Sequence, residues 1–250
     1  MTMPERLNRF LARAGVASRR ASDRLIQTGK VEVNGAIVTH PGTRVEPGVD
    51  RVCVNSQLIE TVDQQTYVLL NKPHGYLVSA HDPHHGQTVY NLLTAIDTRI
   101  FPVGRLDLDT WGVLLLTNDG DLAFRLTHPR YGVEKVYRAL VSGCPNEAAL
   151  QTLRNGVLLE DGPSAPAVVK IVQVKGNDAV LELVLYEGRK RQVKRMCAAI
   201  GHRVRRLTRT HFAGLTRKGL VAGQWRHLTR DELKELREKA GLEDRESGAS

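Results

Sequence analysis

The 250-residue sequence predicts an α+β fold, in which a small α/β module precedes a larger domain built on a mixed, mainly antiparallel sheet with flanking helices. Two observations favour this class. Short strand patterns and short amphipathic helices follow one another without a fixed period, and two tight-turn signals, Asn34-Gly35 and Gly176-Asn177, join neighbouring strands as hairpins. The composition, 41% apolar and 25% charged, is ordinary for a globular protein and excludes wholesale disorder.

Two helices and a hairpin are predicted at the N-terminus. Apolar residues recur at helical spacing in residues 7–14, and Gly15 is a typical C-terminal stop. Ser18 can cap a second helix that ends at Gly29. Residues 30–38 alternate between apolar and polar side chains around the Asn-Gly pair, which is the strongest short hairpin signal.

The domain boundaries follow from the polar stretch after this module. A short strand at residues 51–54 completes the module, and the polar residues that follow have the composition of a linker. We predict a module at 1–60, a linker at 61–66, a second domain at 67–240 and a disordered tail at 241–250.

Strands and helices mix along the second domain. Apolar or alternating runs predict strands, and helical periodicity with caps at Asn146 and at Thr229 predicts helices. The strands are expected at 67–70, 113–116, 135–141 and as a pair within 168–186, and the helices at 88–96, 121–127, 146–154, 190–200 and after Thr229.

The formal net charge of +9 is unevenly distributed along the chain. Residues 186–230 contain 13 Lys and Arg against the single acid Glu187, and residues 1–30 contain 7 against Glu5 and Asp23. Basic clusters of this kind bind phosphate backbones through counterion release, which favours a nucleic-acid partner. The alternative is a pair of solvated helix faces.

Several other classes are excluded or disfavoured. No apolar stretch approaches the roughly 18 to 20 residues that a membrane helix needs, and no signal-peptide core follows Glu5 and Arg6. The three cysteines are widely spaced, which suits reduced thiols better than a disulfide framework. We expect a soluble, cytoplasmic protein without a membrane partner.

Four carboxylates in residues 103–121 are candidates for chemistry. Paired carboxylates beside nucleic acid can hold a divalent metal, whereas a single carboxylate beside a cation can act as a nucleophile or base. Asp107 and Asp109 share a face only if the chain is extended there, and Asp119 and Asp121 lie in a turn typical of a helix N-cap. The residues alone leave both chemistries open.

Three histidines form the other candidate metal cluster. His81, His84 and His85 lie in a loop marked by Pro83 and Gly86, with neither helical pairing nor a cysteine partner. We therefore expect no metal site.

The N-terminal module resembles the S4 RNA-binding domain over residues 5–52, including the start of its second helix at residues 18–21. The resemblance implies that the module positions RNA and does no chemistry. Its arginines fall largely on faces away from the apolar stripe, so that they can converge on phosphates. They include Arg9, Arg19 and Arg20.

The second domain resembles the pseudouridine synthases. The motif GRLD at 104–107, followed by DT at 109–110 and LLLT at 114–117, is similar to their catalytic motif, although Trp111 and Val113 depart from it. Within this family the sequence resembles the ribosomal RsuA/RluB branch more narrowly, because members of that branch carry an N-terminal S4 domain. Further matching segments are LNKP at 70–73, HPR at 128–130, EKVY at 134–137 and EGRKRQVKRM at 187–196.

This resemblance implies a role for each motif residue. Asp107 is the essential carboxylate, which either attacks the sugar or abstracts a sugar proton, and both roles need it ionised. A cation within about 4–6 Å favours the ionised form. Lys194 is the candidate for this cation, ahead of Arg195. The alternative is that Lys194 only contacts phosphate. Tyr137 is expected to stack on the flipped uracil.

The substrate contacts are also inferred from these motifs. Arg105 can fill the space that the flipped base leaves, or hold the flanking phosphate, and Leu70 and Leu106 can line the pocket. The remaining RNA contacts are expected from Arg189, Arg191, Gln192 and Arg195.

The predicted activity is site-specific conversion of uridine to pseudouridine in ribosomal RNA, more specifically 23S rRNA, by a monomer without a cofactor. Residues 127–131 are closer to the large-subunit enzymes than to the small-subunit type. Three alternatives remain: 16S rRNA as the substrate, a non-catalytic RNA-binding assembly factor, and a metal-dependent nuclease.

Overall fold

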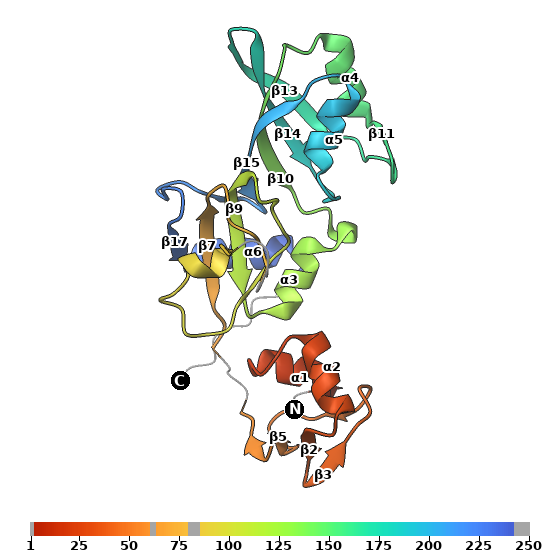
Figure 1. The fold of residues 1–250 in the computed structure, drawn as a ribbon, viewed down its shortest axis with the longest axis vertical. Coiled ribbons are helices and arrows are strands. Elements are labelled where there is room, and N and C mark those ends of the chain that lie inside the picture. The colour runs from red at the N-terminus through yellow and green to blue at the C-terminus, as the bar shows by residue number, and fades with distance from the viewer. Residues whose placement is uncertain (1–2, 61–63, 80–85, 243–250) are drawn as a thin grey trace. The chain divides into compact units, whose positions relative to one another are not determined.

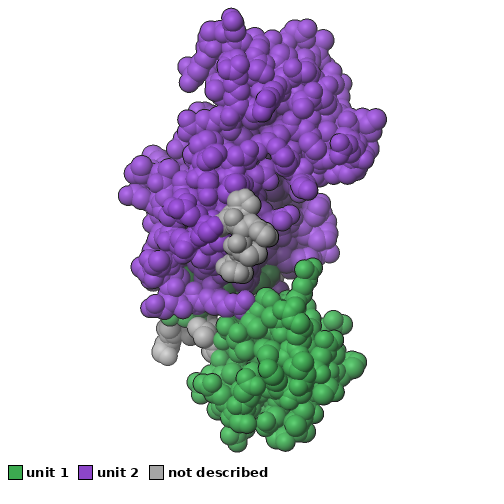
Figure 2. Space-filling model, viewed as in Figure 1, with its two compact units in different colours: residues 1–66, 118–120 green, residues 67–117, 121–250 purple. Residues whose placement is uncertain are grey.

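The computed structural model describes residues 3–60, 64–79 and 86–242 of a chain that divides into two compact units (Figure 2). Unit 1 comprises residues 1–66 and 118–120, and unit 2 comprises residues 67–117 and 121–250. Within the described ranges, no helix combines the length and the apolar composition that crossing a membrane requires.

Two short helices form one side of unit 1. Helices α1 (Leu7–Arg13) and α2 (Arg19–Gln27) contact each other, and the Ser18 hydroxyl accepts a hydrogen bond from the Ala21 amide as the N-cap of α2. Both predicted helices are confirmed. Their apolar faces share one core with the neighbouring strands: Leu7, Phe10, Leu11, Ile26, Val31, Val45, Val52 and Val54.

The sheet of unit 1 has the strand order β3-β2-β5-β6 and is antiparallel. The predicted hairpin joins its first two strands, and both Asn34 and Gly35 have positive φ, as a type I′ turn requires. Strands β1 and β4 form a separate, two-stranded antiparallel sheet. The bounds are β1 Glu5–Arg6, β2 Val31–Val33, β3 Ala36–Val38, β4 Arg44–Val45, β5 Val52–Val54 and β6 Gln57–Leu58.

A nine-stranded sheet forms the centre of unit 2 (Figure 1). Its main path is β13-β14-β10-β15-β9-β7-β17, with β16 paired to β15 and β8 paired to β9. These strands pair antiparallel except β15 and β9, so the predicted mixed, mainly antiparallel sheet is confirmed. The bounds are β7 Tyr67–Lys72, β8 Phe101–Pro102, β9 Thr110–Thr117, β10 Lys135–Val141, β13 Val168–Lys175, β14 Asp178–Leu185, β15 Val204–Phe212, β16 Leu215–Thr216 and β17 Trp225–His227.

Four α-helices, two 3-10 helices and a small hairpin complete unit 2. The helices expected at 121–127, 146–154, 190–200 and after Thr229 are confirmed to within two residues, and the capping box of Thr229 and Glu232 is present. The bounds are η1 Val89–Leu92, α3 Gly120–Thr127, η2 Pro129–Tyr131, α4 Glu147–Asn155, β11 Leu158–Leu159, β12 Gly162–Pro163, α5 Gln192–Ala199 and α6 Arg230–Lys239.

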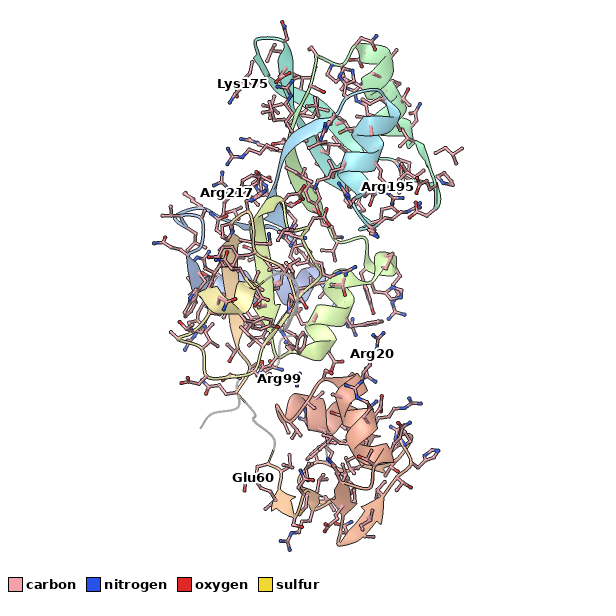
Figure 3. The ribbon with its side chains drawn as sticks, in the orientation of Figure 1. Arg20, Glu60, Arg99, Lys175, Arg195 and Arg217 are labelled. Carbon is pink, nitrogen blue, oxygen red and sulfur yellow. The ribbon has the colours of Figure 1, made fainter. Side chains whose placement is uncertain are left out.

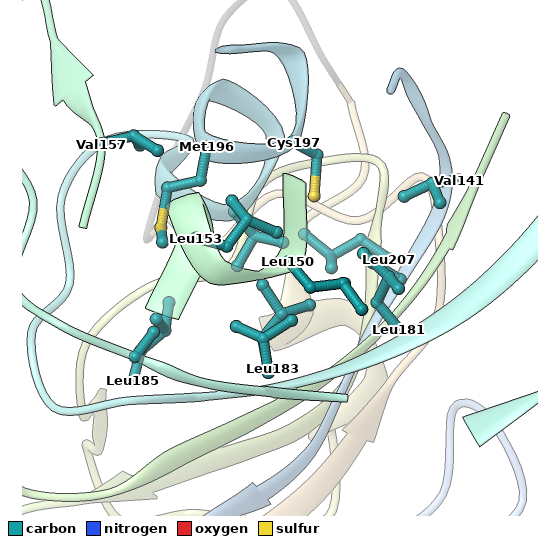
Figure 4. Close-up of a cluster of buried hydrophobic side chains, with 14 of the residues drawn as sticks. Val141, Leu150, Leu153, Val157, Leu181, Leu183, Leu185, Met196, Cys197 and Leu207 are labelled. Atoms are coloured by element: carbon teal, nitrogen blue, oxygen red, sulfur yellow. The ribbon is translucent and has the colours of Figure 1, made fainter. Parts of the chain in front are cut away.

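The two halves of the sheet are covered differently. Strands β7 and β9 are covered on both faces. Leu69 and Leu115 pack with α3 and α6, whereas Leu70 and Leu114 pack with a second cluster formed with Val78, Val89, Leu93, Ile100 and Leu106. This explains why these strands are continuously apolar in the sequence. In the other half, α4 and α5 cover one face of β10, β14 and β15, and in Figure 4 their side chains face the leucines of β14. Strand β14 accordingly alternates between buried and partly exposed residues.

Two sequence-based expectations differ from the structure. The helix expected at 88–96 is only the 3-10 helix η1, because the Val89 amide donates to the Leu77 carbonyl oxygen instead of beginning an α-helical ladder. Strand β15 (Val204–Phe212) was not predicted at all. It is rich in arginine and threonine, and it is a strand because it pairs with both β10 and β9 at the centre of the sheet.

The contact between β9 and β15 requires glycine at position 112. Gly112 has a φ of 112°, and a Cβ atom there would lie 2.0 Å from the carbonyl oxygen of Arg209. We expect Gly112→Ala to lower the free energy of unfolding by about 3 kcal/mol or more in urea denaturation, because two central strands must separate. Gly120→Ala is the control, since nothing lies within 4 Å of its Cβ position. Equal stability of the two variants would contradict this expectation.

Candidate active site

Asp107 lies in a tight loop that leads into strand β9. The Thr110 amide donates to the Asp107 carbonyl oxygen at 3.1 Å, and the Gly75 amide donates to the Leu108 carbonyl oxygen at 2.9 Å. These bonds fix the loop backbone against the turn that follows β7. The Asp107 side chain is 39% exposed, so a substrate can reach its carboxylate.

Lys72 is the scaffold of this loop. It is the last residue of β7 and is fully buried, and its ammonium group donates to carbonyl oxygens of the loop at Asp107 (3.1 Å), Leu108 (3.3 Å) and Thr110 (2.9 Å), as well as to that of Pro73. Burial lowers the pKa of Lys72 to about 8, against the opposing effect of the nearby carboxylates of Asp109 and Asp107. The side chain therefore remains mainly protonated at neutral pH.

Lys194 on helix α5 supplies the cation beside the loop. Its ammonium nitrogen lies 3.6 Å from Oδ2 of Asp107 and forms a shorter hydrogen bond with Asp109. Burial raises the pKa of Asp109, but the hydrogen bond and charge of Lys194 outweigh it and leave this pKa below its ordinary value. The carboxylates of Asp107 and Asp109 thus share the ammonium group of Lys194.

Tyr137 and Leu106 form the apolar part of the site. Tyr137 on strand β10 is partly buried and packs against two clusters, the one under α4 and α5 and the one that contains Val89, Ile100 and Leu106. Leu106 is 7% exposed and belongs to the second cluster, as does Leu70. Leu106, which precedes Asp107 in the chain, and Tyr137 therefore belong to one apolar cluster, and such a surface suits a flat, uncharged base.

A basic cavity of about 730 Å³ adjoins the carboxylates. Five cationic residues line it, from helix α5, the loop before α5 and the residue that precedes β15, and Asp109 contributes to its wall. Its charge is suited to the phosphates of a nucleic acid. The lining residues are Asp109, Glu160, Asp161, Lys190, Arg191, Lys194, Arg195, Ala198, Arg203 and Val204.

Comparison with known proteins identifies the family. Residues 66–199 match the family model for RNA pseudouridylate synthase, and residues 5–50 match that for the S4 domain. The chain is 45% identical to ribosomal large subunit pseudouridine synthase B of Bacillus subtilis, covering 93% of this chain and 96% of that protein. The chain belongs to the RNA pseudouridine synthase family. Both resemblances inferred from the sequence are thereby confirmed.

Other relatives agree with this assignment. An uncharacterized RNA pseudouridine synthase of Aquifex aeolicus is 43% identical over 96% of both chains, and the Salmonella typhi large subunit synthase B is 41% identical over 90% of this chain and 80% of its own. A crystal structure of a pseudouridylate synthase superimposes with a TM-score of 0.66 at 31% identity, covering 92% of this chain and 99% of that one. As a pseudouridine synthase the chain is an isomerase.

Two residues of this synthase that are expected to contact RNA form hydrogen bonds within the protein. Gln192 is 4% exposed, donates to Glu187 at 2.6 Å and accepts from the Arg189 amide at 3.0 Å. The Arg189 guanidinium donates to Glu187 and to the carbonyl oxygens of Gly162 and Pro163. Arg189 thus binds the loop before α5 to the β11–β12 hairpin, and Gln192 holds the same loop through Glu187; their contact with RNA stays a prediction.

The other basic residues differ in their availability. Arg191 is exposed in the cavity wall, whereas Arg195, labelled at α5 in Figure 3, forms a two-bond ion pair with Asp161 at 2.7 and 3.1 Å. Arg105 is exposed two residues before Asp107. In unit 1 of the synthase the three arginines expected to bind RNA are all exposed: Arg9, Arg19 and Arg20.

The remaining carboxylates do not join the site. Asp119 directly precedes α3, and Asp121 lies in its first turn, as their predicted capping position requires. Within the residues that the structure describes, no group of three or more His, Cys, Asp or Glu side chains could hold a metal ion. The histidine cluster at 81, 84 and 85 lies outside the described residues.

Sequence reasoning missed Lys72 and underrated Asp109 in this synthase. A signal for Lys72 was present, since a lysine that ends an otherwise apolar, fully buried strand must find polar partners. No local pattern indicated that Asp109 shares the cation of Asp107, because Lys194 lies more than 80 residues further along the chain.

Proposed function

We propose that this synthase isomerises a specific uridine of 23S ribosomal RNA to pseudouridine, with Asp107 as the essential carboxylate. The observation that carries the proposal is the Asp107 carboxylate, which lies 3.6 Å from the ammonium nitrogen of Lys194, a residue that lines the basic cavity. The choice of RNA is supported by the relatives of Bacillus and Salmonella named as large subunit synthases. Ribosomal RNA as the substrate implies action in the cytoplasm, and we propose that a monomer suffices.

The proposed reaction begins when the target uridine leaves its stack, at a cost of a few kcal/mol. Tyr137 stacks on the uracil, and the exposed Arg105 fills the vacated space or holds the flanking phosphate. Asp107 then acts on the sugar, the bond between C1′ and N1 breaks, and the base turns. A new bond forms between C1′ and C5; the proton on C5 is lost and N1 gains one, so the product is an isomer of the substrate.

The role of Lys194 in this scheme is electrostatic. The positive charge of its ammonium group lies 3.6 Å from Oδ2 of Asp107 and compensates the negative charge of this carboxylate. The nearby Asp109 accepts a hydrogen bond from the same ammonium and thereby orients it.

The test is to incubate the purified protein with 23S and 16S rRNA that lack pseudouridine, and to map the modified positions by carbodiimide treatment and primer extension. We expect modification of 23S rRNA at one or a few positions, intact 16S rRNA, and no effect of EDTA. Modification of 16S rRNA alone would reassign the substrate. RNA cleavage abolished by EDTA would favour a nuclease, and binding without modification would favour an assembly factor.

A further inference from the structure

A half-exposed phenylalanine on helix α3 has no role in the proposed active site. The buried residues of α3 are Leu122, Ala123 and Leu126, which face the core, whereas the side chain of Phe124 points outward and the residue is 48% exposed. Covering an exposed aromatic ring with another flat, apolar group is favourable.

Phe124 belongs to a cluster of flat side chains from residues 124–131. Its ring lies 5.1 Å from that of His128 and 6.3 Å from that of Tyr131, the latter edge-on at 82°. The Arg130 guanidinium lies over the rings of Tyr131, at 4.5 Å, and Phe124, at 5.5 Å. We call Phe124, His128, Arg130 and Tyr131 the α3 platform.

The backbone of η2 holds this platform in place before any ligand binds. The Arg130 amide donates to Nδ1 of His128 at 3.3 Å, and the Tyr131 amide donates to the His128 carbonyl oxygen at 3.1 Å. Arg125 lies 5.6 Å from the Tyr131 ring and is itself bound to the carbonyl oxygens of Ala240 and Gly241. A rigid surface loses little entropy when a ligand stacks on it.

The charge of Arg130 is available to an anion. Its guanidinium donates to the Tyr131 hydroxyl, and among the described residues no carboxylate is paired with it. Most of its N–H groups are therefore free to bind a phosphate, while its planar face continues the stack. Aromatic rings interleaved with arginine are how proteins bind unpaired nucleobases and the phosphates beside them.

The platform is also close enough to the active site to contact the same RNA. Tyr131 and Tyr137 are six positions apart in the chain, so their Cα atoms are at most roughly 21 Å apart. An RNA strand whose target uridine is at Tyr137 can therefore extend to Phe124.

We propose that the α3 platform binds an unpaired nucleobase near the target uridine, by stacking on Phe124 and Tyr131 and by a phosphate contact from Arg130. This site lies outside the pocket that holds the reacting base. The inference rests on the proposed function in one respect, that the substrate is RNA.

The test compares Phe124→Ala with Phe124→Trp in two assays: pseudouridine formation on an rRNA fragment and equilibrium binding of that fragment. For Phe124→Ala we expect KM and Kd to rise roughly tenfold, with kcat within about twofold, because stacking on one base is lost. Phe124→Trp should retain wild-type values, since it preserves a flat ring. Val221→Ala removes part of another exposed apolar side chain, which is 67% exposed, and serves as the control.

The salt dependence separates stacking from charge. Phe124→Ala should leave the slope of log Kd against log salt unchanged, whereas Arg130→Gln should reduce it by roughly 0.7 to 0.9, the value for one phosphate. Wild-type Kd in Phe124→Ala, or a Phe124→Trp protein as weak as Phe124→Ala, would overturn the proposal. Absence of pseudouridine with the wild type would instead overturn the proposed function, and the binding assay would still decide whether the platform exists.

Discussion

Asp107→Asn is expected to abolish pseudouridine formation while leaving the fold and RNA binding intact. Asparagine has almost the same volume as aspartate, and the Asp107 side chain is 39% exposed in the native protein. The substitution should therefore change the stability little. An amide can neither attack the sugar nor take a proton from it. We expect the rate to fall at least about 10⁴-fold, which corresponds to about 5 kcal/mol in the activation barrier.

Asp109→Asn is the matched control for this experiment. Asp109 is two residues away, is 50% exposed and contacts the same ammonium group, so this variant also removes one carboxylate from Lys194. It should lose some activity, because Lys194 is less well oriented, but it should still turn over. If Asp107→Asn retained more than a tenth of wild-type activity, or if only Asp109→Asn were inactive, the assignment of Asp107 would be wrong.

Lys72→Met is expected to have the second largest effect, on both stability and turnover. Methionine fills a similar volume but donates no hydrogen bonds, so four carbonyl oxygens lose their shared donor. Part of this cost is offset because a charged group is no longer buried. We expect the free energy of unfolding to fall by about 3 kcal/mol in urea denaturation, since unsatisfied buried acceptors cost about 1–3 kcal/mol each.

The effect of Lys72→Met on the reaction is distinct from its effect on stability. At a temperature where the variant remains folded, kcat should fall about 10²-fold with little change in KM, because the loop that carries Asp107 shifts while the basic cavity is unaltered. Lys234→Met, on the exposed side of α6, is the control and should match the wild type in both measurements. Wild-type kcat in a folded Lys72→Met protein would show that the ammonium group does not position the loop.

The strength of local patterns explains which elements could be predicted. Asn34-Gly35 specifies its turn by backbone conformation alone, and the Thr229–Glu232 capping box specifies the start of α6 by local hydrogen bonds. Strand β15 lacks such a pattern, because its arginines and threonines are tolerated only between two neighbouring strands. The short apolar spacing at residues 88–96 is equally compatible with a helix and with the 3-10 turn that the Leu77 contact selects.

By itself the sequence determined the fold class, the S4 module, the synthase motif and the candidate pair of Asp107 and Lys194, because each depends on a local pattern or on a motif in one segment. The tertiary structure alone decided the rest. It showed that Lys72 holds the loop of Asp107, that Lys194 is shared with Asp109, and that Gln192 is turned inward. These facts depend on which segments meet in space, and burial gives a polar side chain its role through the partners it finds there.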